Sequence, residues 1–238
     1  MENKKRNIIL FVVLVLLAVA PYLFHNNYQR YVLNNVLINV MLVIALNFIL
    51  GFAGQVFLGT IGFFAISSYV TALVTTTLGM SFWWGLLASV VITAVFSFCL
   101  GLPTLKLSGF YLALMSTGFI VVTTDVLKNW SSLTNGVWGI TNIARPVIFG
   151  HVISTDLQFY YLSFIMTSIL AIIAIVIEDS RFGRAFKAVR DDQLAAEIVG
   201  INATKAKLLA FILSGVYVGV AGALYASFQR FISPDVFS

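Results

Sequence analysis

The chain is poor in the residues that disulfide-rich proteins, metalloproteins and many enzymes need. Its 238 residues include one Cys and two His, and only 10% of them are charged. With Cys99 alone, no disulfide can form within the chain. His25 and His151 are isolated and lack the spacing of metal ligands. We therefore expect neither a metal site nor any other cofactor.

The sequence also lacks the common catalytic motifs. It contains no GxxxxGK[ST], HExxH, CxxC or GxSxG, so a P-loop, a zincin site and a nucleophile elbow are excluded. We expect no catalysis and no ATPase site in this chain. Any energy for active transport must then come from a partner.

Hydrophobic residues make up 60% of the chain. Ordinary soluble domains have about 45–50% apolar and about 25% charged residues, and they need a polar surface. The composition therefore predicts an integral membrane protein. The net charge of +5 is confined to short blocks between apolar runs, which is typical of membrane topology rather than of nucleic-acid binding.

Seven apolar runs are long enough to approach the ~20 residues that cross a bilayer as a helix. They are continuous rather than alternating, which excludes a β-barrel. The run 8–24 follows Lys4, Lys5 and Arg6 and resembles a signal peptide, but the apolar residues resume after Pro21, which favours an uncleaved span. The sequence predicts an all-α, polytopic bundle forming one domain, 1–238, with loops 128–156 and 178–207. The predicted spans are 8–24, 32–50, 61–78, 82–102, 109–127, 157–177 and 208–228.

The basic residues predict an orientation. With the N-terminus in the cytoplasm, ten basic side chains fall on the inner side and four on the outer side, as the positive-inside rule requires. The inner set is Lys4, Lys5, Arg6, Lys106, Arg181, Arg184, Lys187, Arg190, Lys205 and Lys207; the outer set is Arg30, Lys128, Arg145 and Arg230.

The inner loop 178–207 carries an amphipathic pattern. Phe182, Phe186 and Val189 recur at helical spacing, and good helix formers extend over 183–199. Gly200 then favours a helix end, and Asn202 or Thr204 could cap the last span. The helix could lie on the inner leaflet, but its mixed charges favour docking on another protein.

The stretch LNFILGFAGQVFLG, residues 46–59, interrupts an apolar run with glycines and a glutamine. Glycine weakens a helix, and a lone buried glutamine is costly. One interpretation is a tight turn in which Gln55 satisfies loop backbone. The other is a discontinuous helix that lines a translocation path. The path candidates are Asn39, Asn47, Gly51, Gly54, Gln55 and Gly59.

Polar residues within the other parts of the spans allow two interpretations. Asn34, Asn35, Asn39 and Asn47 lie along the second span, where such residues either bond neighbouring helices or line a pathway. Asp125 is the only acid within a predicted span, and its spacing from Lys128 predicts a pair at the interface.

Three separated stretches resemble the permease subunits of bacterial branched-chain amino acid ABC transporters, most closely the LivM-like branch. They are LNFILGFAGQVFLG with its continuation IGFFAISSYVTALV, TNGVWGITNIARP in the outer loop, and residues 180–235, which begin SRFGRAFKAVRDDQLAAEIVG. In such permeases a cytoplasmic helix inserts into the ATPase. Ala195, Ala196 and Gly200 fit its EAA-and-Gly spacing, but Leu194 stands where the pattern has Glu. The resemblance implies an ATPase-coupling set of Phe186, Arg190, Asp191, Ala195, Ala196, Glu197 and Gly200.

The same resemblance implies a multi-pass protein of the bacterial inner membrane that imports hydrophobic amino acids. Its partners would be a second permease, two ATP-binding subunits and a periplasmic substrate-binding protein. Urea or short-chain amide import is the alternative within the family, and an ion-coupled secondary transporter is the alternative outside it. Family members look longer, so we also expect this chain to be incomplete.

Overall fold

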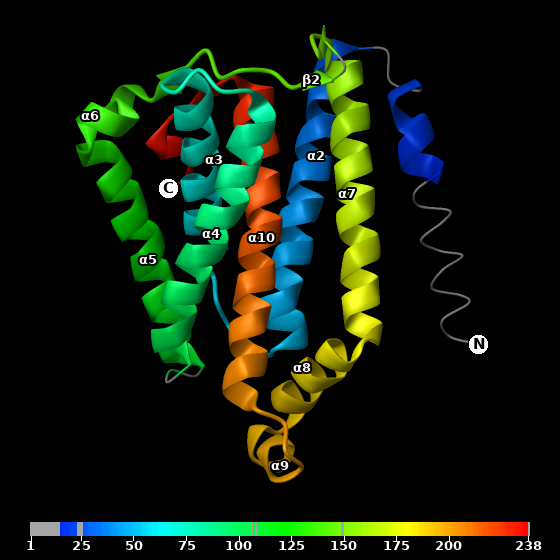
Figure 1. Ribbon diagram of the computed structural model, residues 1–238, viewed down its shortest axis with the longest axis vertical. Coiled ribbons are helices and arrows are strands. Elements are labelled where there is room, and N and C mark those ends of the chain that lie inside the picture. Colours follow the sequence, from blue (N-terminus) through cyan, green and yellow to red (C-terminus); the bar gives the residue numbers. More distant parts are fainter. Residues whose placement is uncertain (1–14, 23–25, 106, 108, 149, 238) are drawn as a thin grey trace.

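The computed structural model describes residues 15–22, 26–105, 107, 109–148 and 150–237, and these form a bundle of long helices (Figure 1). Residues 15–22 are helical. The long apolar helices are α2 (Asn27–Leu46), continued by a π-helical turn η1 (Asn47–Phe52), α3 (Thr60–Thr76), α4 (Phe82–Thr104), α5 (Phe110–Asn129), α7 (Asp156–Asp179) and α10 (Ala203–Gln229). The short helices are α6 (Ser131–Thr134), α8 (Arg181–Asp191), α9 (Gln193–Ile198) and the 3-10 turns η2 (Gly136–Trp138) and η3 (Pro234–Phe237).

The helices match the predicted spans closely. Five of them, of 20 to 27 residues counting α2 with η1, are long and apolar enough to cross a membrane. The sixth, α3, has 17 residues and at 1.5 Å per residue is somewhat shorter than a ~30 Å hydrocarbon layer. The first predicted span, 8–24, lies mostly outside the described residues. The all-α polytopic class is confirmed.

Helix α10 is the centre of the bundle, and it packs against α3 and α4 through glycines. A Cβ added at Gly219 would lie 2.7 Å from the backbone Cα of Val90. A Cβ at Gly215 would collide with Ser97, and one at Gly222 with Ser67. Small residues at these positions let the helix backbones approach closely, which is how helices associate in lipid.

Serine hydroxyls on the neighbouring helices add hydrogen bonds across this contact. Ser67 Oγ of α3 donates to Val218 O at 3.2 Å, and Ser89 Oγ of α4 donates to Gly219 O at 3.1 Å. Each hydroxyl also bonds within its own helix, to Phe64 O and Leu86 O respectively. The hydroxyls of Ser67 and Ser89 are thus satisfied by backbone carbonyls, whereas the buried hydroxyls of Ser97 and Ser214 have no hydrogen-bond partner in the described structure.

Polar bonds also hold α2 and α7 to the bundle. Asn34 is fully buried, and its Nδ2 donates to Asp156 O at 3.1 Å, linking α2 to the start of α7. Asn35 Oδ1 accepts from Gln229 Nε2 at 3.4 Å, linking α2 to the end of α10. For these two asparagines, helix packing is the interpretation that the structure supports.

Charged residues separate to the two ends of the bundle as predicted. Helix α8, helix α9 and the start of α10 lie at one end, whereas the start of α2, the end of α5 and the segment after α6 lie at the other (Figure 1). Helix α8 and the start of α10 carry the basic residues of the first end. Lys4, Lys5, Arg6 and Lys106 are outside the described residues. We call these the α8–α9 end and the opposite end.

At the opposite end, short strands join distant segments. β1 (Ile140–Thr141) pairs antiparallel with β4 (Phe231–Ile232), and β2 (Val147–Ile148) pairs with β3 (His151–Val152). Lys128 Nζ forms its ion pair with Asp235 Oδ1 in η3 at 2.9 Å, whereas the predicted partner Asp125 contributes only a weaker electrostatic attraction. Folding brings η3 beside the end of α5, which local spacing could not reveal.

The glycine contact of α10 predicts a large difference between two identical substitutions. Gly219→Val adds a branched side chain against the backbone of α4, and we expect lower stability by about 1–3 kcal/mol or more. The thermal midpoint of the purified protein should then fall by roughly 5–10 °C. Gly118→Val in α5 is the control, since a Cβ there meets nothing within 4 Å. Equal midpoints for the two variants would contradict the packing account.

Candidate functional site

The segment between α7 and α10 (residues 180–201, the α8–α9 segment) does not form the single helix predicted over 183–199. Asp192 has an extended backbone, with φ −155° and ψ 111°, and ends α8. Its carboxylate then accepts a hydrogen bond from Ala195 N at 3.0 Å and caps α9. Aspartate competes well for backbone donors at helix starts, so it divides the segment into two helices.

The apolar stripe of α8 faces the bundle rather than a partner. Phe186 and Val189 are 1% and 4% exposed and belong to the core, while Phe182 remains half-exposed. Lys187 Nζ pairs with Glu178 Oε1 of α7 at 2.8 Å. Phe186, predicted to couple to an ATPase, therefore anchors the segment from inside.

Helix α9 lies at the far tip of the molecule (Figure 1), and exposed apolar side chains on it and at its end form a knob. Leu194, Ile198 and Val199, which we call the knob, are 74%, 86% and 74% exposed. Ala196, by contrast, is 3% exposed and packs inward. The sequence did not predict the knob, because its helix formers indicated one amphipathic helix over 183–199, and all three knob residues lie outside the apolar stripe of α8.

The segment ends as the sequence predicts. Gly200 has φ +86°, a left-handed conformation that favours glycine. Asn202 then caps α10 by accepting from Lys205 N at 2.9 Å. Gly200 and Asn202 therefore separate the knob from the central helix by a sharp turn.

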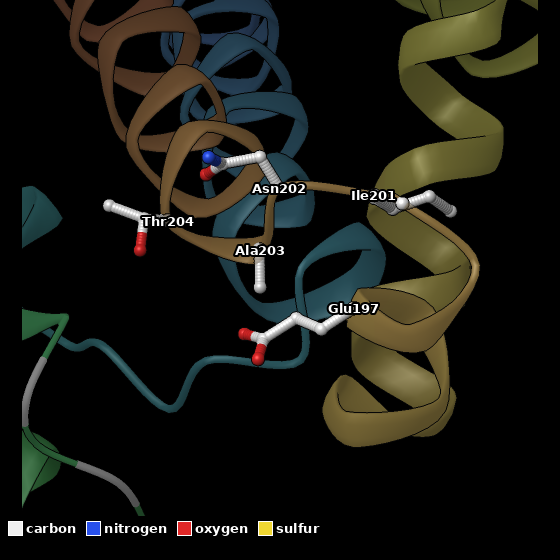
Figure 2. Close-up of a pocket in the computed structure, with 6 residues that line it drawn as sticks. Glu197, Ile201, Asn202, Ala203 and Thr204 are labelled. Carbon is white, nitrogen blue, oxygen red and sulfur yellow. The ribbon is translucent and has the colours of Figure 1, made fainter.

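A polar hollow of about 320 Å³ lies beside the knob, lined by Glu197 and residues 200–204. Figure 2 shows the Glu197 carboxylate pointing across it, below the start of α10. Gln193 Nε2 donates to Glu197 Oε1 at 3.0 Å and helps to hold this position. The knob and the hollow together present apolar and anionic surface side by side.

The break predicted in LNFILGFAGQVFLG is present. Helix α2 loosens into η1, Ala53 N bonds Phe48 O, and Gln55 N bonds Ile49 O at 2.9 Å. Residues 51–59, the break loop, then lead to α3. Gly54 has φ +68°, so its backbone requires glycine or strain. π-Helical turns of this kind are frequent at functional sites.

Aromatic packing and one hydrogen bond fix the far half of the break loop. Phe57 is buried, with its ring centroid 5.7 Å from Phe63 and 5.0 Å from Phe211. Gly59 leaves room for the Phe57 ring. The backbone N–H of Leu58 donates a hydrogen bond to Ser116 Oγ of α5 at 3.0 Å. The loop is therefore an ordered element of the core.

Arg190 joins the two predicted sets of site residues. Its Nη1 donates to Gly51 O at 2.9 Å, although 139 positions separate the two residues. Its Nε and Nη2 bond Asp191 Oδ1 at 3.0 and 2.9 Å. A Cβ at Gly54 would lie 2.5 Å from Arg190 Cγ. The α8–α9 segment thus contacts the break loop directly, through a hydrogen bond to Gly51 and close packing on Gly54.

The other path candidates do not share one cavity. Asn39 is exposed and lines a cleft of about 640 Å³ between α2, α3 and α5, together with Thr60 and Thr117. Asn47 covers Gly51 with its side chain. Gln55 is buried and lines a different cavity beside Arg190. In the described part of the chain, no three His, Cys, Asp or Glu residues group as metal ligands.

Comparison with known proteins gives a family match. The model of the family described as branched-chain amino acid transport system / permease component matches residues 29–238. No solved structure matches the chain significantly.

Among curated proteins, the chain is 30% identical to the high-affinity branched-chain amino acid transport system permease protein LivM of Salmonella typhimurium and of Escherichia coli, over 98% of this chain and 60% of each relative. The nucleoside ABC transporter permease protein NupC of Lactococcus lactis is 30% identical over 70% of this chain and 55% of its own length. The permease protein LivH of Escherichia coli is 31% identical over 46% of this chain and 38% of its own length. The chain thus spans about 60% of the length of the LivM proteins.

The Arg190 contact predicts how firmly the break loop is held. Arg190→Ala removes a hydrogen bond between a charged group and a carbonyl, worth about 1.5–3 kcal/mol. We expect the amides of residues 51–59 to exchange with deuterium about tenfold faster or more. Arg184→Ala is the matched control, because Arg184 Nη1 bonds the backbone oxygen of Asp179 instead. Unchanged exchange in Arg190→Ala would contradict the contact's role.

Proposed function

Since this chain belongs to the family of branched-chain amino acid transport system permease components, we propose that it is the permease subunit of an ATP-binding-cassette importer. Its cargo would be branched-chain or other hydrophobic amino acids, moved across the bacterial inner membrane. The observation that carries this proposal is the exposed knob of α9 joined through Arg190 to the break loop. The 30% identity to LivM over 98% of this chain supports branched-chain amino acids as the cargo.

We infer the orientation from the charges. The α8–α9 end carries Arg181, Arg184, Lys187, Arg190, Lys205 and Lys207 in its described part, which favours the cytoplasm. The knob then projects into the compartment that holds ATP. The opposite end, with its ordered loop and strand pairs, would face a periplasmic substrate-binding protein.

The knob and the adjacent hollow fit a cleft on an ATPase subunit. Bulky apolar side chains that are exposed at the tip of a structure commonly mark an interface. Glu197 in the hollow would receive a basic side chain of the partner, because an anionic hollow complements a cation. Ala195 and Glu197 would contact the partner, whereas Phe186, Ala196 and Gly200 would shape the segment.

In the proposed mechanism, ATP-driven closure of two ATPase subunits moves the α8–α9 segment. Arg190 passes this motion to Gly51 and Gly54, so the break loop shifts between α2 and α3. A second permease would complete the path. Asn39 and Asn47 would line the route, Gln55 would lie at its end beside Arg190, and Gly59 would shape the loop beneath the Phe57 ring. The route would bind its cargo only weakly.

Two alternatives remain as outcomes of the test. Urea or short-chain amide cargo would keep the same architecture, and the likeness to NupC adds nucleosides to the cargos worth testing. An ion-coupled transporter would need acids deep in the spans. In the described spans, Asp125, Asp156, Glu178 and Asp179 all lie within five residues of a helix end.

Reconstitution decides the energy source. The chain, purified with its partner permease, ATPases and binding protein, should accumulate leucine in proteoliposomes only when ATP is supplied. Proteoliposomes with a sodium or proton gradient and no ATP should remain at background, and a catalytically inactive ATPase serves as the control. Accumulation driven by the ion gradient alone would refute an ATP-driven importer.

The knob predicts which residues the ATPase binds. Ile198→Asp places a charge in the centre of the proposed interface, at a cost of about 2 kcal/mol or more. Association should weaken roughly 30-fold, and ATPase should be lost from the co-purified complex. Val137→Asp is the control, since Val137 is exposed at the opposite end. Normal recovery of ATPase with Ile198→Asp would rule out docking through the knob.

A further inference from the structure

A second cavity, separate from the hollow in Figure 2, lies inside the α8–α9 end. It is a partly open pocket of about 220 Å³ bordered by the break loop, the start of α5, the junction of α8 with α9, and Lys207 of α10. The mechanism proposed above needs Arg190 in this region but assigns no occupant to the cavity.

Gln55 is the unusual residue of this cavity. It is 5% exposed, and neither its amide nitrogen nor its amide oxygen has a hydrogen-bond partner in the described structure. Buried amides are nearly always hydrogen-bonded, because leaving them unpaired costs the whole desolvation energy. The side chain offers one donor group and one acceptor group side by side, which suits a ligand that carries both.

The remaining lining groups define the class of ligand. Arg190 and Lys207 bring positive charge, and Asp191 and Asp192 bring negative charge. Leu107 and Leu112, by contrast, give the start of α5 an apolar wall. A molecule with an ammonium group, a carboxylate and an aliphatic body complements all three features, whereas neutral urea uses only the amide.

We propose that this cavity binds a free aliphatic α-amino acid as its zwitterion, with Gln55 hydrogen-bonded to the polar end. The inference rests on the proposed function and adds a place for the cargo at the α8–α9 end. Because Arg190 and Gly54 both line the cavity, a bound amino acid contacts the α8–α9 segment and the break loop together. A cargo molecule that leaves the path would therefore contact the α8–α9 segment and the break loop last, just before its release.

Equilibrium binding to the assembled permease–ATPase complex in nanodiscs, without binding protein and without ATP, tests the site. Radiolabelled L-leucine should bind, and Gln55→Met should weaken its binding about tenfold through the lost hydrogen bonds. Gln229→Met is the matched control, because Gln229 bonds Tyr31 and Asn35 at the opposite end. Leucinamide, which lacks the carboxylate, and 4-methylpentanoate, which lacks the ammonium, should both bind at least tenfold more weakly than leucine.

A measurement on the unmodified chain guards against a misfolded variant. A leucine analogue that carries a photoreactive diazirine should label peptides from the break loop or residues 107–112, in competition with leucine. Labelling confined to other peptides, or equal binding of leucine, leucinamide and 4-methylpentanoate, would overturn the site. Preferred binding of urea or uridine would overturn the ligand class. All of these results leave ATP-driven import standing, because assembly and uptake are measured separately.

Discussion

The close contact of α10 with α3 and α4 constrains everything else in the structure. Gly215, Gly219 and Gly222 have no room for a side chain, and serine hydroxyls from both neighbours bond the backbone of α10. Such an interface resists sliding, because the packed positions are discrete rather than continuous. The three helices therefore behave as one stiff body around which the remaining elements are arranged.

Stiffness in the centre explains why motion would be localised elsewhere. The α8–α9 segment is connected to the start of α10 by Gly200 and Ile201, which lie outside regular helix, and Lys207 Nζ of α10 also donates to Gln193 Oε1 of α9 at 2.7 Å. When a partner displaces the knob, the backbone would bend more easily at this turn than α10 would shift in its packing. The direct contact from Arg190 to Gly51 O then gives the motion a short route to the break loop. In our proposal, the bundle is the frame, and the segment and the loop form the moving part.

Much of this organisation was predictable from the sequence. Apolar runs located the six long helices of the described part to within five residues, because an apolar chain in lipid has few alternatives to a helix. The glycine-rich break, the turn at Gly200 and the cap at Asn202 followed from local backbone chemistry, and each is confirmed. The separation of basic residues to two ends followed from the same spans.

The errors involve one local competition between residues and several contacts between distant segments. Helix formers in 183–199 favoured one helix, but the cap at Asp192 competed successfully and exposed the knob. Lys128 forms its ion pair with Asp235, which lies 107 positions away in the chain, rather than with Asp125. Burial of Phe186 and the grip of Arg190 on Gly51 also depend on how the helices pack. The close contact at Gly215, Gly219 and Gly222 was not predicted, although their spacing places three small residues on one face of a helix.

The central claim is that the first half of the break loop, residues 51–56, travels with the α8–α9 segment, while Phe57 and the residues after it stay packed against the α3–α4–α10 body. Nitroxide labels at the exposed positions Val199, Val56 and Leu87 report on the segment, the loop and α4 respectively. Pulsed dipolar spectroscopy on the assembled complex, with and without ATP, measures the distances between them directly. The account predicts that ATP changes the distance from 56 to 87 and leaves the distance from 56 to 199 nearly constant. A constant distance from 56 to 87, with the distance from 199 to both other labels changing, would contradict it.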